Sequence, residues 1–273
     1  MVIRSLPALP PPVPQERIDA LTDALMGLQP LRQPDVLERL SSDFHNYSPA
    51  LQPLLIRCRA QLAVQASSLE EVRLVASACA RLAVPLTLRG AGTGNYGQCV
   101  PLAGGLVLDL SGLRQLRHID PDSGVFCAEA GIGLAELDRQ LAGHCRSQRL
   151  LPSTVRTASL GGFIAGGAGG IGSLRWGFLR DPGNLLGLEV MTVEAEPRLL
   201  QLDATASAPL NHAYGTNGII TALTLPSSPA VPWQQLVVGF SDWERAVRTL
   251  QELGDTALLL NNAALLQAPV AAA

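Results

Sequence analysis

The stretch PLTLRGAGTGNYGQ, residues 85–98, decides the fold, because it leads a short apolar segment directly into a glycine-rich loop. The segment before Arg89 has the length and side chains of a strand. Glycine has no Cβ, so such a loop can adopt positive φ and bring several backbone N–H groups close to one phosphate. The stretch therefore predicts a strand and a loop that binds a diphosphate. Arg89 either adds a positive charge to that site or faces solvent at the end of the strand.

The loop also contains the pattern GxGxxG, at residues 92–97, which is typical of Rossmann folds that bind dinucleotides. In a Rossmann fold this loop opens a helix, whereas here the turn residues 101–105 follow and a new strand is expected at 106–110. The same pattern recurs at residues 167–172, so it has little specificity in this chain. Both observations argue against a Rossmann fold with NAD.

A second segment rich in small residues follows at 152–167, and hydroxyl side chains come just before its glycines. Small residues allow the backbone to approach a flat ring, and the hydroxyls can reach ribityl or phosphate oxygens. The alternative is a tight crossing in the core with structural glycines. The eighteen uncharged residues between Arg156 and Arg175 include seven glycines, so they favour a ligand-binding segment over a membrane span.

Elsewhere the pattern alternates between strands and helices. Strands are predicted at residues 54–58, 85–88, 106–110, 125–129, 188–193, 199–202 and 218–225, and helices at 15–28, 35–40, 68–82 and 134–141. Asp35 is the expected cap of the second helix, and Ser68 with Glu71 has the spacing of a capping box. Beyond a proline-rich boundary, a strand at 236–240, a helix at 242–253 and a strand at 257–260 would begin a further unit. We therefore expect an N-terminal arm with short helices at 1–50, a main domain at 51–227 and a partial domain at 228–273.

Composition excludes several classes of function. With 47% hydrophobic and 16% charged residues the chain is globular, and its net charge of −3 with scattered basic residues argues against nucleic acid binding. All 20 basic residues are arginine, so Schiff-base lysines and Walker-type phosphate loops are ruled out. The 5 cysteines form no CxxC pair, and the proline-rich N-terminus, from Arg4 to Pro14, lacks the apolar core of a signal peptide and is expected to be extended. These features predict a cytoplasmic protein with reduced thiols and no structural metal site.

Three motifs, in this order, resemble the FAD-binding domain of the PCMH-type flavin oxidoreductase family, which includes enzymes that oxidise D-lactate and glycolate. RGAGTG at 89–94 is similar to the pyrophosphate loop of the family, residues 152–162 to its second flavin segment, and YGTNGII at 214–220 to the motif before the last strand of the domain. The resemblance covers residues 43–226, and residues 233–260 look like the opening of the family's ferredoxin-like cap. It implies an α+β fold, with a PCMH-type FAD-binding domain of two α+β subdomains followed by an incomplete ferredoxin-like cap.

The resemblance also implies FAD as the cofactor and a set of residues that bind it. These residues are Arg89, Gly90, Ala91, Gly92, Thr93, Gly94, Ser153, Thr157, Ser159, Gly162, Gly166 and Ile219. Relatives with covalent flavin carry a histidine in the first loop, where this chain has Thr93. Its histidines stand elsewhere, at positions 45, 118, 144 and 212, so we expect FAD to be bound non-covalently.

The activity implied by the resemblance is that of an FAD-linked oxidase or dehydrogenase, in which flavin N5 accepts a hydride from a 2-hydroxy acid or similar alcohol. Family members continue well beyond this length and supply substrate-binding groups from the rest of the cap. The alternative is therefore a non-catalytic or truncated FAD-binding subunit that needs a protein partner, or that associates with itself through the incomplete cap. No catalytic residue can be assigned, since His212 beside Tyr214 fits either an acid–base pair or a structural histidine.

Overall fold

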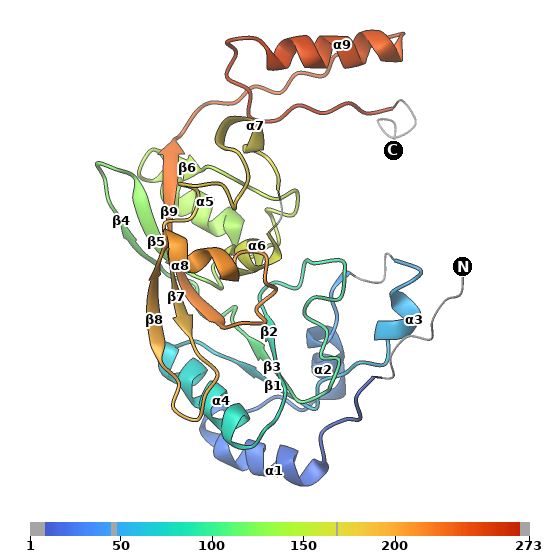
Figure 1. Ribbon diagram of the computed structural model, residues 1–273, viewed down its shortest axis with the longest axis vertical. Coiled ribbons are helices and arrows are strands. Elements are labelled where there is room, and N and C mark those ends of the chain that lie inside the picture. The colour runs from blue at the N-terminus through green and yellow to red at the C-terminus, as the bar shows by residue number, and fades with distance from the viewer. Residues whose placement is uncertain (1–8, 45–47, 168, 268–273) are drawn as a thin grey trace.

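The chain folds into two sheets with their helices, and a C-terminal segment extends away from the second sheet (Figure 1). The computed structural model describes residues 9–44, 48–167 and 169–267. The first sheet is parallel and the second antiparallel. This arrangement confirms the expected fold class, an α+β fold of two subdomains. Of the predicted extended lead-in, residues 1–8 lie outside the described residues, and residues 9–14 form no helix or strand.

The first sheet has three strands in the order β1-β3-β2. They are β1 (Leu62–Gln65), β2 (Leu86–Arg89) and β3 (Leu106–Asp109), and helix α4 (Leu69–Arg81) connects β1 to β2. Helix α4 begins as predicted, since Ser68 Oγ accepts a hydrogen bond of 3.2 Å from the backbone N–H of Glu71. The Glu71 carboxylate accepts the return bond from the N–H of Ser67, at 2.6 Å. Because neighbouring parallel strands end at the same edge, the glycine loop after β2 begins beside the end of β3.

The N-terminal arm contributes directly to the core of this sheet. Its helices are α1 (Gln15–Ala24), the 3₁₀ turn η1 (Met26–Leu28) and α2 (Pro34–Leu40). The apolar stripe Ile18, Leu21 and Leu25 packs with α4 and the strands and is almost fully buried. The prediction that Asp35 caps α2 was wrong. Pro34 occupies the first turn after Gln33, a position where the missing N–H of proline costs nothing.

The second sheet has six strands in the order β4-β5-β9-β7-β8, and β6 also pairs with β9. The strands are β4 (Leu116–Ile119), β5 (Val125–Glu129), β6 (Arg146–Gln148), β7 (Gly187–Met191), β8 (Leu199–Asp203) and β9 (Ile219–Pro229). The predicted pair of strands near 190 and 200 is confirmed as β7 and β8, antiparallel from Gly187 opposite Asp203 to Met191 opposite Leu199. Strand β9 is buried over most of its length, as expected for a central strand.

Short helices accompany this sheet, and its strands and helices contribute side chains to both cores. The helices are α5 (Leu134–Ala142), α6 (Leu160–Gly166), α7 (Ser173–Trp176), α8 (Ala204–Ser207) and the 3₁₀ turn η3 (Ala208–Leu210). Phe163 and Ile164 of α6 pack into the core of the second sheet, whereas Met191 and Ile219 of β7 and β9 belong to the core of the first. No helix in the described part of the chain is long and apolar enough to span a membrane, and the uncharged stretch after Arg156 contains α6 instead.

The predicted strand at 54–58 was wrong. Residues Gln52–Leu55 form the short helix α3, with Pro53 in its first turn, and a turn follows. Proline cannot donate to a sheet ladder but suits the start of a helix. The first strand is β1, at Leu62–Gln65, which the sequence did not reveal because four residues carry little periodicity. The strands β4 and β6 were missed for the same reason, since both are short and neither is fully buried.

The C-terminal segment consists of helix α9 (Trp243–Gly254) between two extended stretches (Figure 1). The predicted aspartate cap is confirmed, because Asp242 Oδ1 accepts a 2.8 Å hydrogen bond from the N–H of Arg245. The strands predicted at 236–240 and 257–260 do not form, since within the described residues neither stretch pairs with a strand. A bond of 2.8 Å from Gly172 N–H to the Asn261 carbonyl ties the segment to the body. The expected division at residues 50 and 227 stays a prediction.

Candidate flavin-binding cavity

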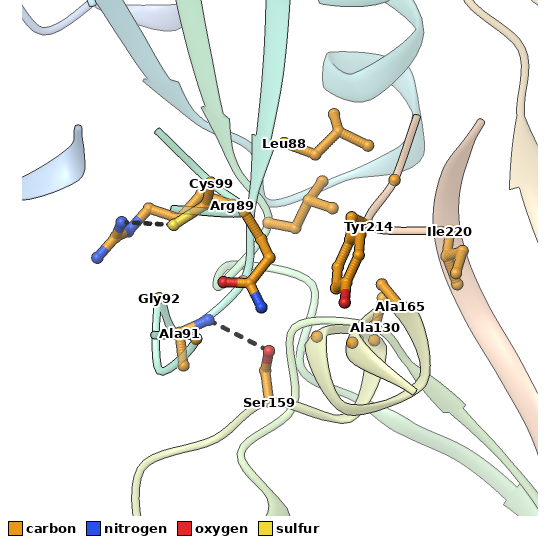
Figure 2. Close-up of a pocket in the computed structure, with 18 of the residues that line it drawn as sticks. Leu88, Arg89, Ala91, Gly92, Cys99, Ala130, Ser159, Ala165, Tyr214 and Ile220 are labelled. Atoms are coloured by element: carbon orange, nitrogen blue, oxygen red, sulfur yellow. Dashed lines mark hydrogen bonds between the residues drawn. The ribbon is translucent and has the colours of Figure 1, made fainter. Parts of the chain in front are cut away.

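An open cavity lies between the glycine loop after β2, helix α6 and the start of β9 (Figure 2). Its volume is about 800 Å³ when the space at its open mouth is counted. It is lined by Asp43, Leu88, Arg89, Gly90, Ala91, Gly92, Thr93, Gly94, Gln98, Cys99, Leu110, Ala130, Ser159, Gly161, Gly162, Ala165, Gly166, Tyr214, Gly215, Gly218 and Ile220. Both small-residue segments singled out in the sequence therefore meet at one cavity.

The loop end of the cavity is shaped by close contact between the loop and α6. Ala91 N–H donates a hydrogen bond of 3.2 Å to Ser159 Oγ, from the residue that precedes α6 (Figure 2). A Cβ on Gly90 would overlap that hydroxyl and lie 3.6 Å from Gly162 Cα, so a side chain there would push loop and helix apart. Gly92 has φ +70°, which few side-chain-bearing residues adopt. The glycines are thus required both for the loop conformation and for its distance from α6.

The other end of the cavity is apolar. Leu88, Leu110, Ala130, Ala165 and Ile220 line it, from strand ends and from α6. This arrangement suits a ligand with a diphosphate and a flat ring. The backbone N–H groups of the glycine loop can bind the anion, and the apolar end of the cavity can exclude water from the ring. The residues present therefore fit FAD.

Arg89 lines the cavity, but its guanidinium is held by the N-terminal arm. Nη1 donates to the carbonyls of Ser42 and Leu40, at 2.6 and 3.1 Å, and lies 3.3 Å from Cys99 Sγ. The guanidinium also packs on Gly92, where an added Cβ would overlap it. Arg89 thus fixes the glycine loop to the N-terminal arm, a structural role that the sequence did not indicate.

Replacing Arg89 by alanine is therefore expected to lower the free energy of unfolding by about 2 kcal/mol, the scale of lost hydrogen bonds to a charged donor. We expect the affinity for FAD to fall less than tenfold, since the backbone N–H groups of the loop remain. Thermal unfolding and an FAD titration would measure both effects. Arg81→Ala is the control, because Arg81 donates to one carbonyl at the surface. Unchanged stability with a large loss of FAD affinity would mean that the guanidinium binds the phosphate instead.

Cys99 is the cavity residue with the most altered acidity. Burial raises the pKa of its thiol to about 11, although the charge of Arg89 acts in the opposite direction. The thiol is therefore protonated at neutral pH and is a poor nucleophile. All five cysteines of the chain are free. Within the described residues, no group of three or more His, Cys, Asp or Glu side chains is arranged to hold a metal ion.

Nine of the twelve sequence-predicted residues line the cavity: Arg89, Gly90, Ala91, Gly92, Thr93, Gly94, Ser159, Gly162 and Gly166. Ser153 and Thr157 are exposed and lie outside its lining. The Ile219 side chain is fully buried in the core, and the next residue of β9, Ile220, faces the cavity. That these twelve residues contact FAD remains a prediction.

Sequence reasoning missed the residues that reach the cavity from distant elements. Asp43 comes from the arm, Leu110 follows β3 and Ala130 follows β5. The alternation of side chains along β9 was the one available signal, since it places the side chains of adjacent residues on opposite faces. Within the described residues no histidine lines the cavity, and His45 lies outside them.

Comparisons with known proteins agree with this geometry. A family model described as an FAD binding domain matches residues 60–199. Glycolate oxidase subunit GlcD of Escherichia coli is 30% identical over 197 residues, which are 70% of this chain and 39% of the relative. D-lactate dehydrogenase of Anaerostipes hadrus is 28% identical over 209 residues, covering 72% of this chain and 42% of that protein. The chain thus spans about two fifths of the length of these relatives.

Among solved structures, alkyldihydroxyacetonephosphate synthase superposes with a TM-score of 0.69 at 20% identity, over 86% of this chain and 47% of the other. At this identity the likeness concerns the fold alone, and it extends over both sheets. The family match covers more than half of the chain and contains both the glycine loop and α6. The chain therefore belongs to the FAD-binding domain family of the PCMH-type flavin oxidoreductases, with FAD as its cofactor.

Proposed function

We propose that this chain is the FAD-binding part of an oxidoreductase that oxidises a 2-hydroxy acid or a similar alcohol. The observation that carries the proposal is the cavity in which the glycine loop and α6 meet beside an apolar slot. The substrate class is supported by the names of the relatives, a glycolate oxidase subunit and a D-lactate dehydrogenase. When bound, FAD would supply a ring that can take up a hydride, which carries both electrons of the oxidation.

In this function the residues of the chain bind and orient. Gly90 to Gly94 hold the diphosphate through backbone N–H groups, and Ser159 fixes the loop against α6. Arg89 secures the same loop from the arm. Leu110, Ala130 and Ile220 exclude water from one end of the cavity. The exposed C-terminal segment is the part of the chain at which a protein partner or a second copy would complete a substrate site.

The test is to load the purified chain with FAD and mix it anaerobically with glycolate, with D-lactate and with longer 2-hydroxy acids. We expect slow loss of the visible flavin absorbance with at least one of them and no change with the corresponding keto acids. The absorbance should fall slowly because hydride transfer requires the substrate carbon to be held in a fixed geometry. Helix α9 buries a single residue, Ala246, within the described segment, so it packs too loosely to hold a substrate in place. FAD that binds but is reduced by none of these acids would contradict the proposed activity.

We also expect the flavin to be bound non-covalently. Thr93 stands in the loop where covalent relatives have a histidine, and its neighbours in the cavity lining include no described histidine. Acid precipitation of the purified yellow protein should therefore release the flavin into the supernatant, where absorbance quantifies it. As a second measurement, the protein is unfolded in urea and passed over a desalting column. Flavin that stays with the polypeptide in both would show a covalent bond.

A further inference from the structure

The segment between η3 and β9 places an aromatic side chain in the cavity wall. The Tyr214 ring lies across the apolar end of the cavity, toward Ala165 and Ala130, and its neighbour along the wall is Ile220 (Figure 2). Tyr214 is 39% exposed, so part of the phenol is uncovered. Opposite it the wall is made of small residues, which leaves room beside the ring. An aromatic ring with free area next to such a slot is a surface on which a planar heteroaromatic ring can pack.

His212 holds this ring. The imidazole Nε2 and the Tyr214 hydroxyl are 2.8 Å apart, and the two rings meet edge to face with centroids separated by 5.1 Å. The imidazole in turn packs on Gly167, where an added Cβ would overlap it. The position of the phenol is therefore set by a hydrogen bond and by ring packing together.

The backbone of this pair is in a disfavoured conformation that the surrounding structure maintains. His212 has φ +63° and Tyr214 has φ +53°, values that residues with a side chain rarely adopt. The N–H groups of the two residues donate to the carbonyls of Ile164 and Ala165 in α6, at 3.0 and 2.9 Å. Left-handed backbone held in this way is concentrated at ligand-binding sites. The backbone of the pair is thus anchored to α6, the helix that also lines the cavity.

We propose that Tyr214 packs its ring against a planar ring of the bound dinucleotide, and that His212 is a positioning residue that acts through the Tyr214 hydroxyl. The inference rests on the proposed flavin site. The planar ring is either the isoalloxazine or the adenine of FAD, and both offer the same stacking chemistry. The pair contributes to binding and needs no proton transfer.

The experiment is a set of FAD titrations of the apoprotein, followed by the fluorescence of the bound flavin. Tyr214→Ala should raise the Kd for FAD about tenfold or more, the effect expected from losing one aromatic stacking partner. Tyr214→Phe keeps the ring and loses the hydroxyl, so it should raise the Kd by a smaller factor. His212→Ala should raise the Kd by a smaller factor in the Tyr214→Phe background than in the parent, because the hydrogen bond is already gone there and only the ring packing remains. Tyr96→Ala is the matched control, since Tyr96 is 69% exposed on the same glycine loop and outside the cavity lining.

Titrations with FMN and with ADP separate the two rings. A loss of FMN affinity in Tyr214→Ala, with brighter bound flavin, identifies the isoalloxazine as the stacked ring, and a loss of ADP affinity identifies the adenine. Thermal unfolding of each apoprotein shows which variants are folded. If Tyr214→Ala is not folded, Tyr214→Phe provides the test of Tyr214 instead. Tyr214→Ala that binds FAD as tightly as the parent overturns the role of Tyr214. If His212→Ala raises the Kd for FAD by the same factor in the parent and in Tyr214→Phe, the positioning role of His212 is overturned. A parent chain that binds no FAD overturns the proposed function instead.

Discussion

Replacing Gly92 by valine is expected to abolish FAD binding while most of the secondary structure stays in place. Gly92 has φ +70°, and a Cβ there would overlap the Arg89 guanidinium that holds the loop to the arm. A β-branched side chain is among the least tolerant of this backbone region. It would distort the loop and displace the Arg89 guanidinium, so the backbone N–H groups that we assign to the diphosphate would no longer converge. We expect the Kd for FAD to rise more than a hundredfold, which corresponds to about 3 kcal/mol of binding free energy.

The control for this substitution is Gly183→Val. Gly183 also has a positive φ, of +88°, but nothing lies within 4 Å of an added Cβ, and the residue is outside the cavity lining. It reproduces the backbone strain without touching the loop. Far-ultraviolet circular dichroism and FAD titration of both variants separate loss of the site from loss of folding. If Gly92→Val bound FAD as tightly as the parent, the diphosphate would lie elsewhere.

Replacing Gly131 by alanine is expected to be among the most destabilising single changes in the chain. Gly131 follows β5 and approaches the end of β3 so closely that a Cβ would overlap the Leu110 carbonyl and lie 2.7 Å from the Leu113 carbonyl oxygen. Both neighbours are backbone atoms and cannot turn away as the end of a side chain can. The methyl group would separate the two sheets where they are joined. We expect the free energy of unfolding to fall by about 3 kcal/mol, and Tm by roughly 6–12 °C.

Gly27→Ala is the comparison for this prediction. Gly27 lies in η1, and nothing is found within 4 Å of an added Cβ, so alanine there should change the stability by less than about 1 kcal/mol in either direction. Urea and thermal unfolding measure both variants. Leu110 and Ala130 line the cavity, so Gly131→Ala should also weaken FAD binding. A Gly131→Ala protein as stable as the parent would mean that the junction between the sheets can widen at little cost.

Features that depend on neighbouring residues could be predicted from the sequence. Ser68 and Glu71 mark the start of α4, Asp242 marks the start of α9, and the glycines of residues 90–94 mark a loop that can turn its N–H groups toward an anion. Caps, turns and side-chain alternation are set by local backbone chemistry. These signals, with the order of the three motifs, were sufficient for the family and for FAD.

Contacts between distant residues were decided only by the tertiary structure. The sequence did not show that the Arg89 guanidinium bonds to the arm, that Ile220 and not Ile219 faces the cavity, or that the backbone of His212 and Tyr214 is anchored to α6. It predicted a strand at residues 236–240, which has the composition of a strand but has no described partner to complete a ladder. The physical reason is the same in each case. Local propensity states what a segment can become, whereas its partners depend on which elements the packed sheets bring together.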